Sequence, residues 1–210
     1  AFGGKVTTSK VNTPGNVAAL GWLHDAIYKN KIAPQAVTGW QEGQVQQEFT
    51  SGHAAFAINY PFVESVAASG GPAKGHVGYI PFPPQKGGSP GAALGGEMLA
   101  INAKSAHAQA AWKLIQYLTS SSVEVARAEA TGDPPALPAA YTSALYAKAP
   151  YFQAVKRLNS FAQPRPVTPK YLQVSSDLQT AISSVFSNQS SAAAALSSAA
   201  SQIATDTSGS

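Results

Sequence analysis

The 210-residue chain carries a formal net charge of +4, with 44% hydrophobic residues, 11% charged residues and no cysteine. This length and apolar content allow one large domain or two small lobes. The lack of cysteine excludes disulfides, thiolate zinc sites and cysteine nucleophiles within the chain. The 14 lysines and arginines are scattered singly, which argues against a nucleic-acid-binding surface.

The first 50 residues predict two helices with an aromatic loop between them. Thr13 and Pro14 form a typical helix start, because a capping side chain precedes a proline at the first helical position. The apolar stripe that follows comprises Val17, Leu20, Leu23 and Ile27. Trp40 lies in the polar loop 38–43, where it either covers local core or offers a ligand a stacking surface. Residues 44–49 predict the second, shorter helix.

Two short apolar runs predict buried strands in the next part of the chain. They lie at 54–60 and 77–82, and both are rich in aromatic and branched residues. A helix over 62–68 follows the first of them. Tyr60 and Phe62 therefore flank a strand-to-helix junction, which is where ligands bind in many open α/β folds.

A glycine pair, a third strand and a helix are predicted near the middle of the chain. Gly95 and Gly96 allow the backbone unusual angles and a close approach to a ligand. The apolar run 98–101 predicts a buried strand, and a helix capped by Ser105 is expected over 105–118. Together these segments fit one wall of a binding site, and equally a tight turn that has no chemical role.

The last 90 residues are predicted to be mainly helical. Helices are expected over 121–130, twice within 139–159, from the Thr168-Pro169 start through Val185, and over 188–204. Arg165 lies between two prolines in an extended segment, 163–169. Thr168 and Pro169 repeat the helix-start pairing, so Tyr171 is expected in the first turn of the following helix.

Motifs for enzymatic chemistry are missing from the sequence. It has no Gly-x-Ser-x-Gly elbow, no His-Glu-x-x-His pair and no phosphate-binding glycine loop. The four histidines are not at metal-ligand spacing. We therefore expect no enzyme, no metal and no cofactor.

The residues in loops and at the ends of predicted helices and strands fit a sugar-binding site better than an enzyme active site. Sugars present apolar C–H faces to aromatic rings and hydroxyls to polar groups, and a hydroxyl buried without a partner loses about 1–3 kcal/mol. Aromatic and polar side chains of this kind are Trp40, Tyr60, Phe62, Glu97, Arg165 and Tyr171. Two alternatives stay open: an Ala/Ser-rich structural or interaction protein at a cell surface, and a glycoside hydrolase that uses Glu97 or Asp133.

Nearly the whole chain resembles the family-1 extracellular solute-binding proteins of carbohydrate ABC importers. The matching stretches are 13–32, 49–62, 77–83, 94–101, 110–120 and 132–138. Their order and spacing together carry the resemblance. Arg165-Pro166, followed by Tyr171, resembles the trehalose/maltose-type branch, in which such an arginine and tyrosine line the sugar cleft.

The resemblance implies roles for individual residues. Tyr60 and Phe62 match positions where aromatic rings stack on sugar, and Gly95 and Gly96 match a backbone edge beside it. Glu97 replaces an aromatic residue of that branch, and a carboxylate would bind hydroxyls instead of stacking. Trp40 lies in a loop that varies within the family.

The resemblance also implies an incomplete type II periplasmic-binding-protein-like α/β fold, mostly the carboxy-terminal lobe. Residues 1–88 and 133–210 would belong to that lobe, and residues 89–132 to the amino-terminal lobe. The expected partners are a carbohydrate, the missing amino-terminal lobe and ABC transporter permease subunits, with no nucleic acid. The implied location is extracellular or periplasmic, with a lipoprotein anchor on the full-length form.

Overall fold

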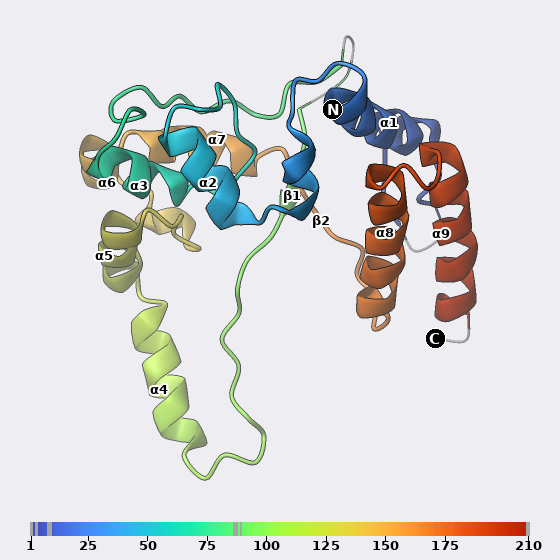
Figure 1. Cartoon of the computed structure of the whole chain (residues 1–210). Coiled ribbons are helices and arrows are strands. Elements are labelled where there is room, and N and C mark those ends of the chain that lie inside the picture. The colour runs from blue at the N-terminus through green and yellow to red at the C-terminus, as the bar shows by residue number, and fades with distance from the viewer. Residues whose placement is uncertain (1, 3, 8–9, 86–87, 89, 209–210) are drawn as a thin grey trace. The chain divides into compact units, whose positions relative to one another are not determined.

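The computed structural model describes residues 2, 4–7, 10–85, 88 and 90–208. The chain is mainly helical and divides into two compact units (Figure 1). Unit 1 comprises Ala1–Trp40, Pro81–Gly95 and Phe161–Ser210, and unit 2 comprises Gln41–Ile80 and Gly96–Ser160. The assignment of 1–88, 89–132 and 133–210 to two lobes stays a prediction, and residue 89 at its first boundary lies outside the described residues.

Unit 1 is built on the helices α1 (Pro14–Tyr28), α8 (Tyr171–Phe186) and α9 (Ala192–Thr207). The helices α8 and α9 lie side by side, and α1 packs on both (Figure 1). The predicted cap of α1 is confirmed, because Thr13 Oγ1 accepts a hydrogen bond from the Asn16 amide at 3.3 Å. The apolar faces of the helices share one core: Val11, Leu20, Val174, Ala181, Val185, Ala195, Leu196, Ala199 and Ile203.

Two short parallel strands complete unit 1, together with the 3₁₀ helix η1 (Gln35–Gly39). The strands β1 (Ala92–Leu94) and β2 (Ala162–Pro164) pair with Leu94 opposite Pro164. Because the strands are parallel, their carboxyl ends lie at the same edge. The residues that follow them, Gly95 and Arg165, therefore leave this strand pair at the same edge.

Unit 2 consists of short helices joined by extended segments. The helices are α2 (Glu42–Thr50), α3 (Val63–Ser69), α4 (Ala108–Leu118), α5 (Ser121–Thr131), the 3₁₀ helix η2 (Pro138–Ala140), α6 (Ser143–Lys148) and α7 (Tyr151–Asn159). A small core joins α5, α6 and α7 through Ala128, Leu145, Phe152 and Val155. The two helices predicted within 139–159 are thus confirmed.

The three predicted buried strands are wrong. Residues 54–60, 77–82 and 98–101 lie in no strand, and none of their apolar side chains is fully buried. Phe56 is 84% exposed and Met98 is 94% exposed. A strand of an α/β sheet exists only where a neighbouring strand supplies its hydrogen bonds, and none of the described residues does so here. The apolar pattern alone did not reveal this.

Two helices begin later than their sequence signals predict. The helix expected from Ser105 begins at Ala108, and the helix expected from Thr168 begins at Tyr171. Ser105 Oγ accepts from the His107 amide at 3.1 Å, and Thr168 Oγ1 accepts from the Lys170 amide at 3.1 Å. Each side-chain oxygen closes a turn before the helix begins. It therefore does not cap the helix itself.

Among the described residues, no helix has both the length and the apolar character needed to cross a membrane.

Candidate functional site

In unit 1, the chain places a cation directly over an aromatic ring. Arg165 follows β2 and is exposed, and Tyr171 is the first residue of α8. The guanidinium carbon of Arg165 lies 5.3 Å from the centroid of the Tyr171 ring, within the range of a cation–π contact. The pair offers several N–H donors beside a phenol ring, which suits a polyhydroxylated ligand.

Gly95 belongs to the same edge of unit 1, because it follows β1 as Arg165 follows β2. Gly95 and Gly96 are exposed, and neither has a positive φ. A Cβ atom added to either would meet nothing within 4 Å. The unusual backbone angles expected for this pair are therefore not found. Nothing in the described part of the chain requires glycine there, although the bare backbone stays open to a ligand.

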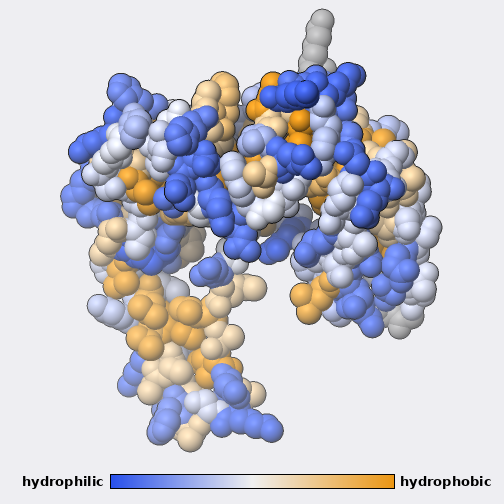
Figure 2. Space-filling model, viewed as in Figure 1, coloured by the Kyte–Doolittle hydropathy of each residue, from blue (hydrophilic) through white to orange (hydrophobic). Residues whose placement is uncertain are grey.

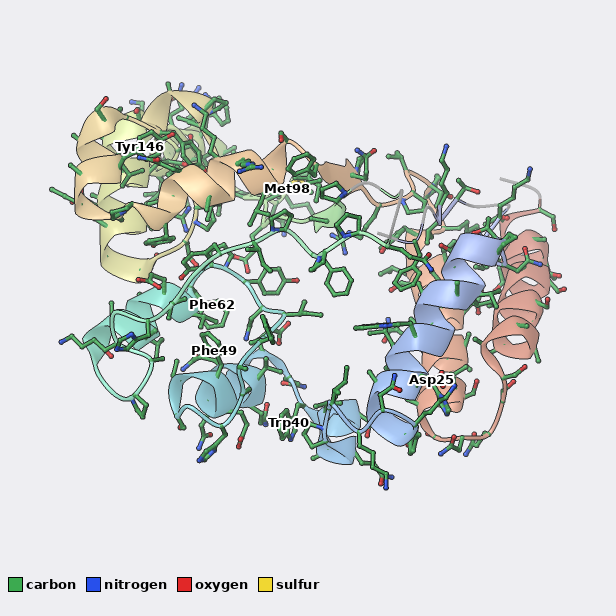
Figure 3. The ribbon with its side chains drawn as sticks, turned by 90° about the horizontal axis from the view of Figure 1, so that it is seen from above. Asp25, Trp40, Phe49, Phe62, Met98 and Tyr146 are labelled. Atoms are coloured by element: carbon green, nitrogen blue, oxygen red, sulfur yellow. The ribbon has the colours of Figure 1, made fainter. Side chains whose placement is uncertain are left out.

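Trp40 ends η1 and is half-buried, and its amide donates to the Val37 carbonyl oxygen at 3.3 Å. Figure 3 shows it where the chain leaves η1. Both alternatives for this residue, local cover and stacking surface, stay open.

In unit 2, Tyr60 and Phe62 lead into α3 (Figure 3 labels Phe62). Tyr60 is 62% exposed and Phe62 is half-buried. The backbone here is held by Asn59, whose Oδ1 accepts from the Tyr60 amide at 2.8 Å. Asn59 Nδ2 donates to the Glu42 carbonyl oxygen at 2.9 Å. The start of α3 thus presents an exposed ring on an anchored backbone.

Glu97, also in unit 2, is exposed. It has no hydrogen bond or ion pair with any residue that the structure describes, so its carboxylate is available to solvent or ligand. The eight predicted residues are thus divided between the units. Unit 1 brings Gly95, Arg165 and Tyr171 to one region, and unit 2 holds Tyr60 and Phe62 two residues apart.

A network in unit 2 was not predicted from the sequence. Tyr79 Oη donates to Glu64 Oε2 at 2.5 Å, and the Tyr79 ring lies 5.7 Å from that of Tyr151. Tyr151 Oη donates to the Gly132 carbonyl oxygen at 3.1 Å. Because Glu64 lies in the first turn of α3, this network fixes the turn that carries Phe62. No sequence spacing relates these residues, since they come from four separate segments.

Both tyrosines of this network stay protonated at neutral pH. Burial, and then the hydrogen bond to Glu64, raise the pKa of Tyr79 well above its ordinary value. Burial raises the pKa of Tyr151 to about 12, with a smaller contribution from nearby carboxylates. Their hydroxyls therefore donate hydrogen bonds throughout the neutral range.

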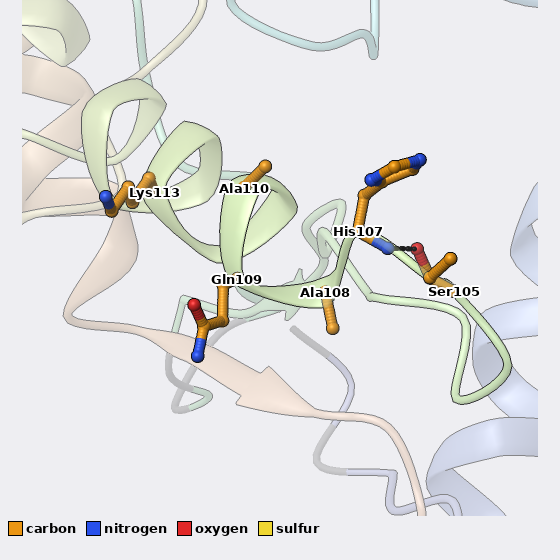
Figure 4. Close-up of a pocket in the computed structure, with 7 residues that line it drawn as sticks. Ser105, His107, Ala108, Gln109, Ala110 and Lys113 are labelled. Carbon is orange, nitrogen blue, oxygen red and sulfur yellow. Dashed lines mark hydrogen bonds between the residues drawn. The ribbon is translucent and has the colours of Figure 1, made fainter.

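A surface depression lies at the beginning of α4 (Figure 4). Its lining comprises Ser105, Ala106, His107, Ala108, Gln109, Ala110 and Lys113. It is open to solvent and contains none of the predicted site residues. Within the described ranges, no group of three or more histidines and carboxylates is placed to hold a metal ion.

Comparisons with known proteins agree with the fold. The family model "Bacterial extracellular solute-binding protein" matches residues 1–125. A probable ABC transporter-binding protein of Deinococcus radiodurans is 34% identical over 206 residues, which cover 96% of this chain and 48% of that protein.

Solved structures are similar over almost the whole chain. Maltose-bound MalE3 of T. maritima has 32% identity and a TM-score of 0.90, covering 96% of this chain and 54% of that one. A tagatose-bound ABC transporter solute-binding protein of Thermotoga lettingae has 26% identity and a TM-score of 0.83, covering 98% of this chain and 53% of that one. The chain therefore spans about half the length of these relatives.

These similarities confirm the type II periplasmic-binding-protein-like fold, of which the chain holds about half. The family consists of solute-binding proteins and not of enzymes, so the glycoside hydrolase considered above is not supported. It also implies a periplasmic or extracellular location. The chain belongs to the bacterial extracellular solute-binding proteins.

Proposed function

We propose that this chain contributes sugar-binding residues to a solute-binding protein of an ABC transporter, with a disaccharide or oligosaccharide as ligand. The names of its relatives support this. One is a probable ABC transporter-binding protein, one was solved with maltose, and a maltodextrin-binding domain of Bdellovibrio bacteriovorus, 25% identical, was solved with maltotriose.

The arrangement of Arg165 and Tyr171 is the observation that carries this proposal. The guanidinium lies 5.3 Å from the ring centroid, next to the strand edge that Gly95 also leaves. Arginine N–H groups and the tyrosine hydroxyl bind sugar hydroxyls, and the exposed backbone at Gly95 allows a ring to come close. Charged donors make the stronger hydrogen bonds, about 1.5–3 kcal/mol each.

Unit 2 carries, by itself, aromatic residues proposed to stack on sugar. The exposed Tyr60 ring and the half-buried Phe62 ring would cover the C–H face of a sugar. Glu97 would accept hydrogen bonds from hydroxyls, beside the backbone of Gly96. Trp40 is the weakest member of the set, because no contact ties it to the other residues.

The remaining parts of the proposal follow the family. The sugar would lie in a cleft between two lobes, with most of the amino-terminal lobe supplied by polypeptide that this chain does not span. Closure of the lobes on sugar would create the form that docks on the permease subunits of the transporter. A lipid anchor on the full-length form would hold the protein at the membrane.

Saturation-transfer difference NMR on the 210-residue chain with millimolar maltose tests the proposal. This method detects weak binding, and we expect transfer from aromatic protons to the sugar C–H protons. Tyr171→Ala removes the ring and Arg165→Ala removes the donors, so each variant should lose most of the transfer.

Tyr117→Ala is the matched control, because Tyr117 is 64% exposed and lies on α4, outside the proposed site. It should leave the signal unchanged. Equal signals from the wild-type chain and both site variants would contradict the proposal.

A further inference from the structure

The first turn of α3 is held by contacts that come from three other segments of unit 2. Tyr79 Oη donates to Glu64 Oε2 at 2.5 Å, and both side chains are half-buried. The Tyr79 ring packs on that of Tyr151, whose Oη donates to the Gly132 carbonyl oxygen at 3.1 Å. Gly132 lies directly against α3, because a Cβ atom added to it would meet the Ser65 Cβ at 3.0 Å. Residues 64 and 65 are thus fixed from outside the helix.

The helix α3 has little means of fixing this turn by itself. It is seven residues long, and its N-cap residue, Phe62, makes no capping hydrogen bond through its side chain. Isolated helices of this length are unstable in water. The amides of Val63, Glu64 and Ser65 close the turn by donating to the carbonyl oxygens of residues 60, 61 and 62, at 3.3, 3.1 and 3.1 Å. The persistence of these bonds depends on packing from outside the helix.

The other end of the network rests on the core of unit 2. The rings of Tyr151 and Phe152 are in contact, with their centroids 4.2 Å apart. Phe152 is 0% exposed and packs with Leu145 and Val155 in the core that joins α5, α6 and α7. Because side chains in a close-packed core have little freedom to move, Tyr151 is a firm support for the ring of Tyr79.

Tyr79 itself is not free to contact a ligand through its hydroxyl, since Glu64 accepts that hydrogen bond. We infer that Tyr79 is a positioning residue, which holds the start of α3 through Glu64. The Tyr60 and Phe62 rings, which lead into this turn, thereby stay in place for stacking on a sugar, so the inference rests on the proposed function. Rings that are already held in place lose less conformational freedom when a ligand binds, and this strengthens binding.

Hydrogen exchange and maltose titration, both followed by NMR on the 210-residue chain, test the inference. Tyr79→Phe removes the hydroxyl and keeps the ring. In the sugar-free chain, the amides of residues 63–65 should then exchange about tenfold faster, because a hydrogen bond to a carboxylate is lost. The dissociation constant for maltose should rise about three- to tenfold.

Two substitutions of Glu64 separate the hydrogen bond from the side chain. Glu64→Gln should behave like the wild type, because the new amide oxygen still accepts from Tyr79. Glu64→Ala should reproduce the effects of Tyr79→Phe, and combining the two should cost no more than either alone.

Tyr141→Phe is the matched control. It also removes one tyrosine hydroxyl from unit 2, but Tyr141 Oη is buried and has no hydrogen-bond partner among the described residues. It should change neither the exchange of residues 63–65 nor the affinity for maltose.

A second control addresses contact of maltose with other apolar surface of unit 2. Figure 2 shows such surface gathered most densely over α4, where Leu114 is 56% exposed. Leu114→Gln should leave both measurements unchanged.

Three results with Tyr79→Phe would overturn the inference: unchanged exchange at residues 63–65, faster exchange there with unchanged maltose affinity, or faster exchange throughout unit 2. The last result would mean that the hydroxyl serves general stability. A wild-type chain that binds no maltose would contradict the proposed function, and exchange in the sugar-free chain would still decide whether Tyr79 holds the start of α3.

Discussion

Asp177 lies in surroundings that disfavour the negative charge of its carboxylate. Its Oδ2 atom is out of contact with solvent and has no hydrogen-bond partner among the described residues. Burial, and then the nearby Asp206 carboxylate, raise the pKa of Asp177. The ionised form is therefore disfavoured in the folded chain, and Asp177 destabilises unit 1 at neutral pH.

We expect Asp177→Asn to raise the Tm at pH 7 by about 1–3 °C, because it removes this charge. For an acid whose folded pKa is raised, the destabilisation is complete above that folded pKa. It disappears as the pH falls below the unfolded value of 3.8. The difference in Tm between the variant and the wild type should thus shrink on acidification. Thermal unfolding followed by circular dichroism between pH 7 and pH 3.5 checks this, and a variant that is less stable at pH 7 would refute it.

At the scale of elements, α5 is joined to the proline-rich turn after it by one buried side chain. Glu124 is 5% exposed, and its Oε2 accepts from the amides of Ala136 at 2.5 Å and Leu137 at 3.3 Å. Gly132 ends the helix with a φ of 80°, a left-handed angle that glycine adopts without strain. Together these residues return the chain toward α6.

Replacing Glu124 by alanine leaves the partly buried N–H groups of Ala136 and Leu137 without their acceptor. We expect the free energy of unfolding to fall by about 2–3 kcal/mol, measured by urea titration. Glu129→Ala on the same helix is the control, because Glu129 forms a surface ion pair with Lys148 at 2.8 Å. Its loss should change the stability by less than about 1 kcal/mol. Equal effects of the two substitutions would show that Glu124 does not hold the turn.

At the scale of the whole molecule, the chain should bind sugar weakly by itself. Micromolar affinity corresponds to about 8 kcal/mol, and half of that binding energy gives roughly millimolar affinity. Since the chain spans about half the length of its relatives, we expect isothermal titration calorimetry with maltose to show at most millimolar binding. Micromolar binding by the isolated chain would mean that it holds a complete site.

Local signals in the sequence determined most helices and the family. The cap formed by Thr13, the proline after it and the apolar stripe of α1 act within one or two turns, so they are readable without the fold. The closeness of Arg165 and Tyr171 was also foreseeable, because Tyr171 is only six positions after Arg165.

Only the tertiary structure decided which extended segments become strands and which distant side chains meet. The runs 54–60, 77–82 and 98–101 look like strands in sequence, yet among the described residues only β1 and β2 pair, across about 70 residues. The contact of Glu64 with Tyr79, and of Tyr79 with Tyr151, likewise joins segments far apart in the chain. A helix makes its hydrogen bonds within its own segment, whereas a strand depends on a partner whose position no local pattern encodes.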